Sequence, residues 1–152
     1  MIDVRPASLD DQDVRAIIAF HQQDMAEVSP PGTSFALDVS GLSGPDVTLL
    51  GAWEDRNLIA IGALKRLGGR SAELKSMRTL PDHLGKGAAR GILEALIVHA
   101  RSEGLVKLSL ETGTSIAFQP AIALYLCHGF TEGPGFADYA NGPHNQCYHL
   151  DL

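Results

Sequence analysis

The sequence predicts a mixed α/β fold: a central, mostly antiparallel sheet flanked by helices. Three apolar segments, residues 47–53, 58–66 and 72–80, follow one another with only short turns between them. Such spacing is typical of antiparallel strands joined by hairpins. Segments with apolar residues at helical spacing stand on either side of these strands, which indicates helices packed on a sheet. A length of 152 residues suits one domain, so we expect residues 1–152 to form a single domain.

Before these strands, we expect a short strand at residues 2–4, a helix near residues 9–25 and a long loop at residues 29–46. The helix prediction depends on apolar side chains three to four positions apart. His21 falls on the same face, and we interpret it as a residue at the margin of the core. The loop contains three prolines and three glycines, and loops of this length often carry function.

Pro81 ends the third strand, and a glycine-bearing turn then leads into a strongly amphipathic helix. Ile97 is expected on the polar face of that helix, where an apolar residue favours a homodimer surface. After that helix we expect a strand at residues 106–110 and a helix at residues 117–128. Phe130 and residues 146–152 then indicate one or two closing strands. The apolar stripe of the amphipathic helix consists of Ala89, Ile92, Leu93, Leu96 and Ala100.

The balance of charges excludes some classes of protein. Eighteen Asp and Glu residues against twelve Lys and Arg give a formal net charge of −6. A general binder of nucleic acid or of anionic membranes needs a basic patch, so we expect neither kind of partner. The longest apolar stretch, residues 92–100, is interrupted by Glu94 and His99 and is too short to span a bilayer.

The N-terminus and the two cysteines, Cys127 and Cys147, indicate the compartment. The first residues lack the basic and apolar regions of a secretion signal, so we expect a cytoplasmic protein with free thiols. The spacing of cysteine and histidine matches no standard ligand pattern, so we expect no bound metal.

The most informative segment is residues 84–89, LGKGAA, between a strand and a helix. Glycines there allow the backbone to curl around an anion, and the N-terminus of the helix offers unpaired N–H groups. Two nucleotide-binding motifs do not fit this segment. A Walker loop needs Ser or Thr after its lysine, whereas Gly87 follows Lys86. A Rossmann fingerprint needs a third glycine where Arg90 stands.

Two short patterns fit better. Residues 84–89 follow (Arg/Gln)-x-x-Gly-x-(Gly/Ala) at Gly87 and Ala89 and depart from it at Leu84. Residues 121–130, AIALYLCHGF, follow Ala-x-x-Leu-Tyr-x-x-x-Gly-Phe throughout. Both patterns, in this order and about 40 residues apart, resemble the signatures of the GNAT N-acetyltransferase superfamily. The order of the expected elements also matches, so the resemblance covers essentially the whole chain.

The resemblance implies a splayed sheet and an acetyl-CoA-dependent N-acetyltransferase. Its acceptor would be the amine of a small molecule or peptide, which attacks the acetyl group directly in a ternary complex. The alternative is a non-catalytic domain of the same fold that binds or senses acyl-CoA, because Leu84 and Phe118 replace residues that are usual in the family. The residues that the resemblance assigns to acetyl-CoA are Met77, Arg78, Thr79, Leu84, Gly85, Lys86, Gly87, Ala88, Ala89 and Arg90.

Acetyl transfer needs a base for the acceptor ammonium and an acid for the departing thiolate. The resemblance implies that Tyr125 is the acid and that Glu73 is the base. Glu111, at the end of the next strand, and a chain of water molecules are the alternatives for the base. Strand alternation predicts that one face of the sheet carries Glu73, Lys75, Met77 and Thr79. The backbone N–H of Met77 is expected to hold the oxyanion.

The acceptor is expected to bind among loops that face the splayed strands, as the resemblance implies. The candidates are residues 29–37 and the segment that contains Asp138 and Tyr139. Loop composition alone does not name the acceptor.

Overall fold

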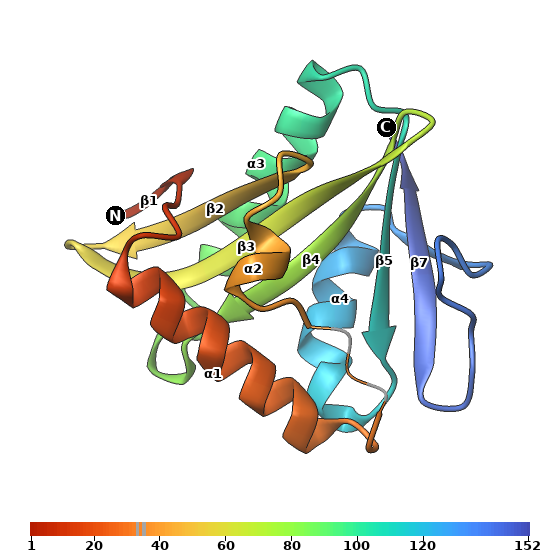
Figure 1. Ribbon diagram of the computed structural model, residues 1–152, viewed down its shortest axis with the longest axis horizontal. Helices are drawn as coiled ribbons and strands as arrows, with labels where there is room; N and C mark the ends of the chain where they lie inside the picture. The colour runs from red at the N-terminus through yellow and green to blue at the C-terminus, as the bar shows by residue number, and fades with distance from the viewer. Residues whose placement is uncertain (33, 35) are drawn as a thin grey trace.

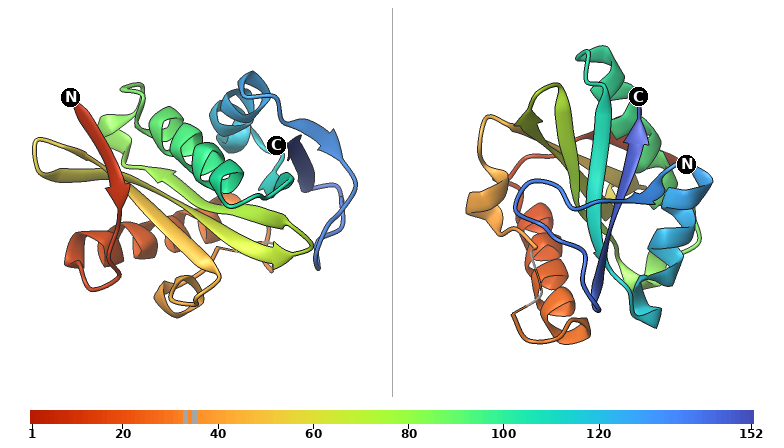
Figure 2. Two further views of the ribbon diagram at one scale, coloured as in Figure 1. Left: turned by 90° about the horizontal axis from the view of Figure 1, so that it is seen from above. Right: turned by 90° about the vertical axis from the view of Figure 1, so that its right-hand side faces the viewer.

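The computed structural model describes residues 1–32, 34 and 36–152, which form one sheet with helices on both faces (Figures 1 and 2). In this described part, seven strands are ordered β1-β2-β3-β4-β5-β7-β6. Neighbouring strands are antiparallel except for β4 and β5, which are parallel. The predicted fold class is therefore confirmed. The strands are β1 (Ile2–Pro6), β2 (Val47–Glu54), β3 (Asn57–Gly68), β4 (Ser71–Thr79), β5 (Lys107–Gly113), β6 (Thr131–Gly133) and β7 (Asn145–Asp151).

Helices α1 and α2 cover one face of the sheet, and α3 and α4 cover the other (Figure 2). The first helix begins later than predicted because Asp11 caps it: its side chain accepts a hydrogen bond from the backbone N–H of Asp13 at 2.8 Å. The predicted helix at residues 117–128 is a 3₁₀ turn followed by an α-helix. The helices are α1 (Gln12–Val28), α2 (Val39–Leu42), α3 (Ala88–Ser102) and α4 (Gln119–Cys127), with 3₁₀ turns η1 (Pro81–His83) and η2 (Ile116–Phe118).

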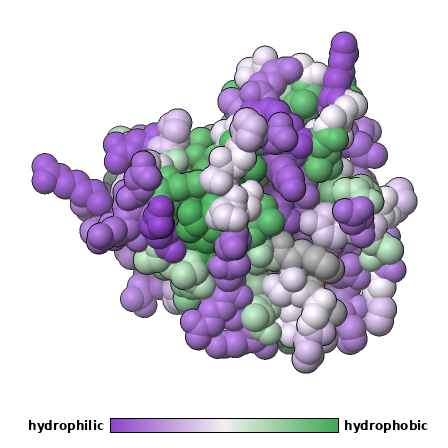
Figure 3. Space-filling view, viewed as in Figure 1, coloured by the Kyte–Doolittle hydropathy of each residue, from purple (hydrophilic) through white to green (hydrophobic). Residues whose placement is uncertain are grey.

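Two apolar cores lie on opposite faces of the sheet. The core on the α3 side is the larger and includes Leu64, Leu74 and Ile92. The core on the α1 side includes Ile18 and Ile61. On the α1 side, apolar residues also gather at the surface around α2 (Figure 3). The sheet is thus buried on both faces, which explains why its central strands are almost continuously apolar.

Ile97 is buried, contrary to the sequence prediction. Only 6% of its surface is exposed, because it belongs to the core between α3 and the sheet. The apolar face of α3 is wider than the predicted stripe: Leu93, Leu96, Ile97 and Ala100 follow the spacing of a helix that packs on a sheet. The argument for a homodimer surface at Ile97 is therefore wrong.

The sheet opens between its two parallel strands. Residues 71–73 of β4 pair with residues 107–109 of β5, and beyond these pairs the two strands diverge (Figure 1). Strands β3 and β7 continue to pair with β4 and β5 past this point. Each side of the sheet stays intact, and a wedge-shaped opening forms between them. The expected splay is confirmed by this register.

Candidate active site

A cleft of about 830 Å³ occupies the opening between β4 and β5 and extends to the start of α3. It brings together most of the residues predicted from the sequence, although they come from separate parts of the chain. The sequence-predicted residues that line it are Glu73, Met77, Arg78, Thr79, Leu84, Gly85, Gly87, Ala88, Ala89, Arg90, Glu111 and Tyr125.

The glycine turn at one end of the cleft fits an anionic ligand. Gly85 and Gly87 have φ angles of 77° and 89°, and a Cβ at either position would meet nothing within 4 Å. Gly87 is the N-cap of α3, and among the described residues no side chain caps this end of the helix. The first N–H groups of α3 are therefore available to an anion, and the helix dipole favours negative charge there.

Lys86, between the two glycines of the turn, is absent from the lining of the cleft. Its Nζ donates to Glu54 Oε1 at 2.8 Å and lies 3.1 Å from Nδ1 of His83. The hydrogen bond from Lys86 lowers the pKa of Glu54. In this structure the positive charge of Lys86 is therefore paired with Glu54.

A β-bulge interrupts β4 beside the opening. Ser76 and Met77 together oppose Gly62 of β3, so β4 carries one extra residue. Ser76 takes a φ of 56°, in the left-handed region. Gly62 has no space for a side chain, because a Cβ there would lie 2.5 Å from Met77 Sδ.

The bulge overturns the prediction that Glu73, Lys75 and Met77 share a face. Lys75 pairs with Ala63, whose side chain belongs to the core on the α1 side, whereas Met77 packs against the core on the α3 side. Glu73 lies two positions before Lys75 and shares its face. Alternation fails between Lys75 and Met77 because the inserted residue shifts the side-chain direction by one position.

Glu73 and Lys75 form a buried ion pair on the α1 side of β4. Lys75 Nζ lies 3.0 Å from Glu73 Oε2, and the side chains are 9% and 6% exposed for Lys75 and Glu73. Lys75 also donates to the hydroxyl of Tyr139 at 2.7 Å. Burial raises the pKa of Tyr139, and its hydrogen bond to Glu73 raises it further. Tyr139 thus fastens the loop before β7 to β4.

Glu111 is a different kind of carboxylate. Among the described residues that line the cleft, it is the acidic side chain without an ion-pair partner. Burial raises its pKa, although a hydrogen bond from Asn145 Nδ2 at 3.1 Å acts in the opposite direction. A carboxylate with a raised pKa and no cation bound to it is suited to accept a proton.

Tyr125 lies on α4, on the α3 side of the sheet. It is 6% exposed, and its ring contacts Phe130 with centroids 5.7 Å apart. Burial raises the pKa of its hydroxyl, which therefore stays protonated and able to donate. Tyr125 and Glu111 both line the cleft, although they come from opposite faces of the sheet.

Sequence reasoning did not find the contact between His21 and Arg78. Arg78 Nε donates to His21 Nδ1 at 2.9 Å, and Arg78 Nη1 lies 2.8 Å from Asp24 Oδ2. Burial lowers the pKa of His21 to about 4, and the guanidinium of Arg78 adds to this effect. The helical spacing of α1 could indicate only that His21 faces inward, because its partner lies on a distant strand.

The remaining residues singled out from the sequence lie in different places. Ser29, Ser34 and Ala36 from the expected acceptor loop line the cleft, whereas Thr33 and Phe35 lie outside the described residues. Asp138 is absent from the lining of the cleft. Phe118 is buried beneath the opening, where its ring occupies the space that a Cβ at Gly113 would need.

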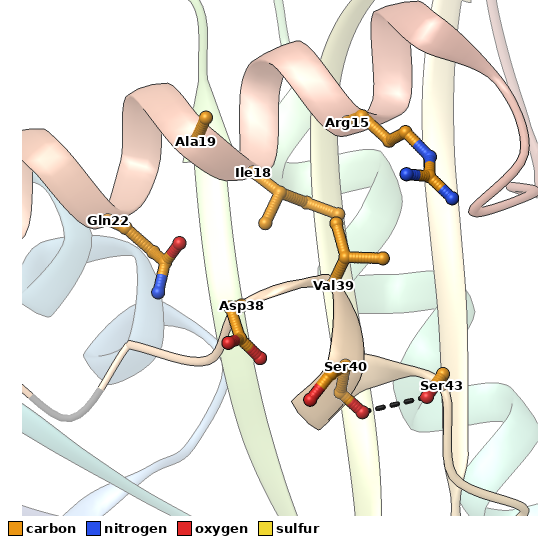
Figure 4. Close-up of a pocket in the computed structure, with 8 residues that line it drawn as sticks. All are labelled: Arg15, Ile18, Ala19, Gln22, Asp38, Val39, Ser40 and Ser43. Carbon is orange, nitrogen blue, oxygen red and sulfur yellow. Dashed lines mark hydrogen bonds between the residues drawn. The ribbon is translucent and has the colours of Figure 1, made fainter.

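A second, smaller hollow of about 400 Å³ lies between α1 and α2 (Figure 4). It holds none of the residues predicted for the site. Ser43 Oγ donates to the backbone oxygen of Ser40 at 2.7 Å there, and Asp38 caps α2. Across the described ranges, no group of three His, Cys, Asp or Glu side chains is arranged to hold a metal ion.

The chain was compared with known protein families and structures, and the family that it matches fits the geometry of the cleft. A model of the acetyltransferase (GNAT) family matches residues 14–130. The chain belongs to the GNAT acetyltransferase family. The match includes the glycine turn, the bulged strand and Tyr125. Members of this family use acyl-CoA and act on small-molecule or peptide acceptors.

Individual relatives extend this match to the whole chain. The uncharacterised N-acetyltransferase YedL of Escherichia coli is 43% identical over 152 residues, which cover 100% of this chain and 96% of YedL. A proposed acyl-CoA N-acyltransferase of Klebsiella pneumoniae superimposes with a TM-score of 0.84 and 25% identity over 100% of this chain and 98% of the other. The PaiA N-acetyltransferase of Thermoplasma acidophilum, solved in complex with coenzyme A, has the same fold, with a TM-score of 0.75 and 15% identity over 100% and 99% of the two chains.

Across residues 1–32, 34 and 36–152, no helix has the length and apolar character needed to cross a membrane.

Proposed function

We propose that the protein is an acetyl-CoA-dependent N-acetyltransferase that acetylates the amine of a small molecule or peptide by direct attack in a ternary complex. The observation that carries this proposal is the continuity of the cleft. One cavity joins the anion cradle at the start of α3 to the opening in the sheet where Tyr125 and Glu111 lie. Because the cleft takes residues from His21 to His144, residues 1–152 would act as one catalytic domain.

The cradle would bind the pyrophosphate of acetyl-CoA through backbone N–H groups of residues 84–90. The side-chain-free space at Gly85 and Gly87 supports this role, because a phosphate can approach the backbone closely there. From this turn, the pantetheine arm would run along Met77, Arg78 and Thr79 of β4. The acetyl group would then reach the opening between β4 and β5.

The acceptor amine would approach from the α1 side of the opening. It is charged in water at neutral pH, so it must lose a proton before its nitrogen attacks the carbonyl carbon. Glu111 is the better base, because its pKa is raised by burial and no described cationic side chain forms an ion pair with it, whereas Glu73 is already paired with Lys75. Glu73, directly or through water, is the alternative. The backbone N–H of Met77 would hold the oxyanion that forms on the carbonyl oxygen.

When the carbon–sulfur bond breaks, the thiolate of CoA must take up a proton. Tyr125 would donate it from the α3 side of the opening. Its raised pKa keeps the hydroxyl protonated until the thiolate forms. The base and the acid would therefore act from opposite faces of the sheet, with the thioester between them.

A domain that binds acyl-CoA without catalysis is the second candidate. Leu84 is exposed at the mouth of the cleft, where an arginine or glutamine is usual, and this weakens a side-chain contact to phosphate. The presence of Tyr125 and of an unpaired Glu111 in the same cavity favours the enzyme. We also propose a cytoplasmic location, where acyl-CoA is available and where the two free cysteines, one of them exposed, stay reduced.

Calorimetric titration with acetyl-CoA tests the proposal, with ATP and NAD as controls. We expect micromolar binding of acetyl-CoA and none of the controls. Thiol release would then be followed while small amines and peptides are screened as acceptors. Absence of acetyl-CoA binding would contradict both the enzyme and the binding domain. Tight binding without thiol release for any class of amine would favour the binding domain.

A further inference from the structure

Ser76, on β4, carries a buried hydroxyl. In the part of the chain that the structure describes, Ser76 Oγ is the one fully buried side-chain oxygen or nitrogen without a hydrogen-bond partner. The residue is 8% exposed and lines the cleft. Burial of a hydroxyl without a partner is unfavourable, because the group loses its hydrogen bonds to water. Such an exception in a folded protein calls for an explanation.

The backbone of Ser76 is unfavourable as well. Its φ of 56° lies in the left-handed region, which residues with a side chain rarely adopt. Glycine would relieve this strain and would also remove the unsatisfied hydroxyl. Two costs therefore coincide at one residue, and that residue sits on the bulge, past the last pair between β4 and β5. Strain of this kind is concentrated at functional sites.

We propose that Ser76 Oγ donates a hydrogen bond to the carbonyl oxygen of the acyl thioester and becomes part of the oxyanion hole. This inference rests on the proposed function. Ser76 directly precedes Met77, whose backbone N–H we assign to the same oxygen, so the two donors would come from adjacent residues of the bulge. A side-chain donor without an internal partner has no hydrogen bond to break before it donates to the oxygen on which negative charge develops.

The chemical step balances with this assignment. The amine nitrogen forms a bond to the carbonyl carbon, and the electron pair of the C=O π bond moves to the oxygen, which accepts the hydrogen bond from Ser76. The pair then returns, the carbon–sulfur bond breaks, and the thiolate takes a proton from Tyr125. The nitrogen loses two protons in all: the first, from the ammonium, resides on the base, and the second, released as the amide forms, returns through water to the oxygen of Tyr125. Ser76 keeps its own proton throughout.

Infrared spectroscopy of acetyl-CoA labelled with ¹³C at the carbonyl gives a direct test that needs no acceptor. Hydrogen bonds to the carbonyl oxygen weaken the C=O bond, so binding to the wild-type protein should lower its stretching frequency. We expect Ser76→Ala to lose part of this shift. Its affinity for CoA, which lacks the acetyl group and its thioester carbonyl, should stay unchanged. Once an acceptor is known, kcat should fall roughly 100-fold in this variant with little change in KM for acetyl-CoA.

Two further variants separate this role from a structural one. Ser71→Ala removes a hydroxyl from the far end of β4, where Ser71 Oγ donates to the backbone oxygen of Gly68, and should leave the frequency as in the wild type. Ser76→Gly removes the hydroxyl and relieves the backbone, so it should fold at least as stably as the wild type and still lose the shift. It therefore keeps the test decisive if Ser76→Ala folds poorly.

The outcomes distinguish the two proposals. An identical C=O frequency in the wild type, Ser76→Ala and Ser76→Gly would overturn the role of Ser76 and leave the proposed function standing. Failure of the wild type to bind acetyl-CoA would overturn the proposed function itself. A loss of shift in the Ser76 variants, with Ser71→Ala unchanged, would support the assignment.

Discussion

Arg78 on β4 donates a hydrogen bond from Nε to Nδ1 of His21 on α1, across 2.9 Å at the edge of the cleft. The acceptor nitrogen must carry its lone pair, so the imidazole is neutral with its proton on Nε2. Asp24 holds the other side of the guanidinium at 2.8 Å. The three side chains join α1 to the bulged strand, and this junction depends on His21 staying uncharged.

The junction predicts a loss of stability in mild acid. Burial lowers the pKa of His21 from 6.5 to about 4, so the unfolded chain binds a proton there before the folded one does. The contribution of His21 is complete above pH 6.5 and is lost as the pH falls toward 4. Between pH 7 and pH 5, His21 alone should lower the free energy of unfolding by about 2 kcal/mol.

Urea denaturation of the wild type and of His21→Asn at both pH values measures this contribution. Asparagine keeps an acceptor near the position of Nδ1 but does not titrate. The variant should lose correspondingly less stability than the wild type on acidification. Equal losses in both proteins would show that His21 titrates in the same way in the folded and unfolded chains.

Gly87 predicts a separation of stability from ligand affinity. Gly87→Ala should lower the free energy of unfolding by about 1 kcal/mol, because alanine is strained at a φ of 89°. The added methyl group and the relaxed turn should also weaken binding of acetyl-CoA roughly tenfold, which corresponds to about 1.4 kcal/mol. Thermal unfolding and calorimetric titration measure the two effects.

Gly104 supplies the matched control at the other end of α3. It has a φ of 76° and open space around its Cβ position, but it does not line the cleft. Gly104→Ala should cost similar stability and leave the affinity for acetyl-CoA unchanged. If the two variants bound acetyl-CoA equally well, the cradle at Gly87 would be ruled out.

The antiparallel order β2-β3-β4 and the glycine turn could be predicted from the sequence, because both depend on short-range patterns, whereas Tyr125 was singled out by the resemblance of residues 121–130 to a family signature. Turn composition marks hairpins, and glycines before a helix mark a cradle. The bulge at Ser76 was not predicted: the alternation of polar and apolar residues breaks at Lys75 and Ser76, but only the pairing with β3 shows that an extra residue is inserted there. The apolar face that includes Ile97 was also underestimated, because its width depends on how much of α3 the sheet covers.

The electrostatics of the site were less predictable than its location. Glu73 and Glu111 are both acidic residues on neighbouring strands, and the sequence does not distinguish a paired carboxylate from an unpaired one. The distinction depends on Lys75, which faces Glu73, and on Asn145, which reaches Glu111 from β7. Tertiary contacts of this kind follow from register, which local patterns do not specify.

Tyr125→Phe tests the assignment of the acid. Removal of the hydroxyl should leave the affinity for CoA unchanged and lower kcat roughly tenfold to a hundredfold, because the thiolate would leave unprotonated. Tyr148→Phe removes the hydroxyl of another tyrosine whose residue is buried, on β7 and outside the cleft, and should retain activity. Thiol release with the acceptor found by screening measures both variants. Equal turnover in the two would argue against Tyr125 as the acid.

Glu111→Gln and Glu73→Gln should have opposite effects on stability. The pKa of Glu111 is raised by burial above its ordinary value of 4.5, so its ionised form destabilises the fold as the pH rises through that range. Glu111→Gln should therefore be more stable than the wild type at pH 7 and equal to it in acid. Glu73→Gln should lose about 3 kcal/mol at pH 7, because Lys75 would be left buried without its carboxylate.

Turnover then identifies the base independently of stability. The acidic limb of the pH profile of kcat/KM reports protonation of the base, and for a carboxylate with a raised pKa it should lie above pH 4.5. Glu111→Gln should lose both activity and this limb. Glu73→Gln, measured at a temperature where it is folded, should keep the limb even if its activity falls. The reverse pattern would assign the proton transfer to Glu73 and leave Glu111 as a residue that only lines the cleft.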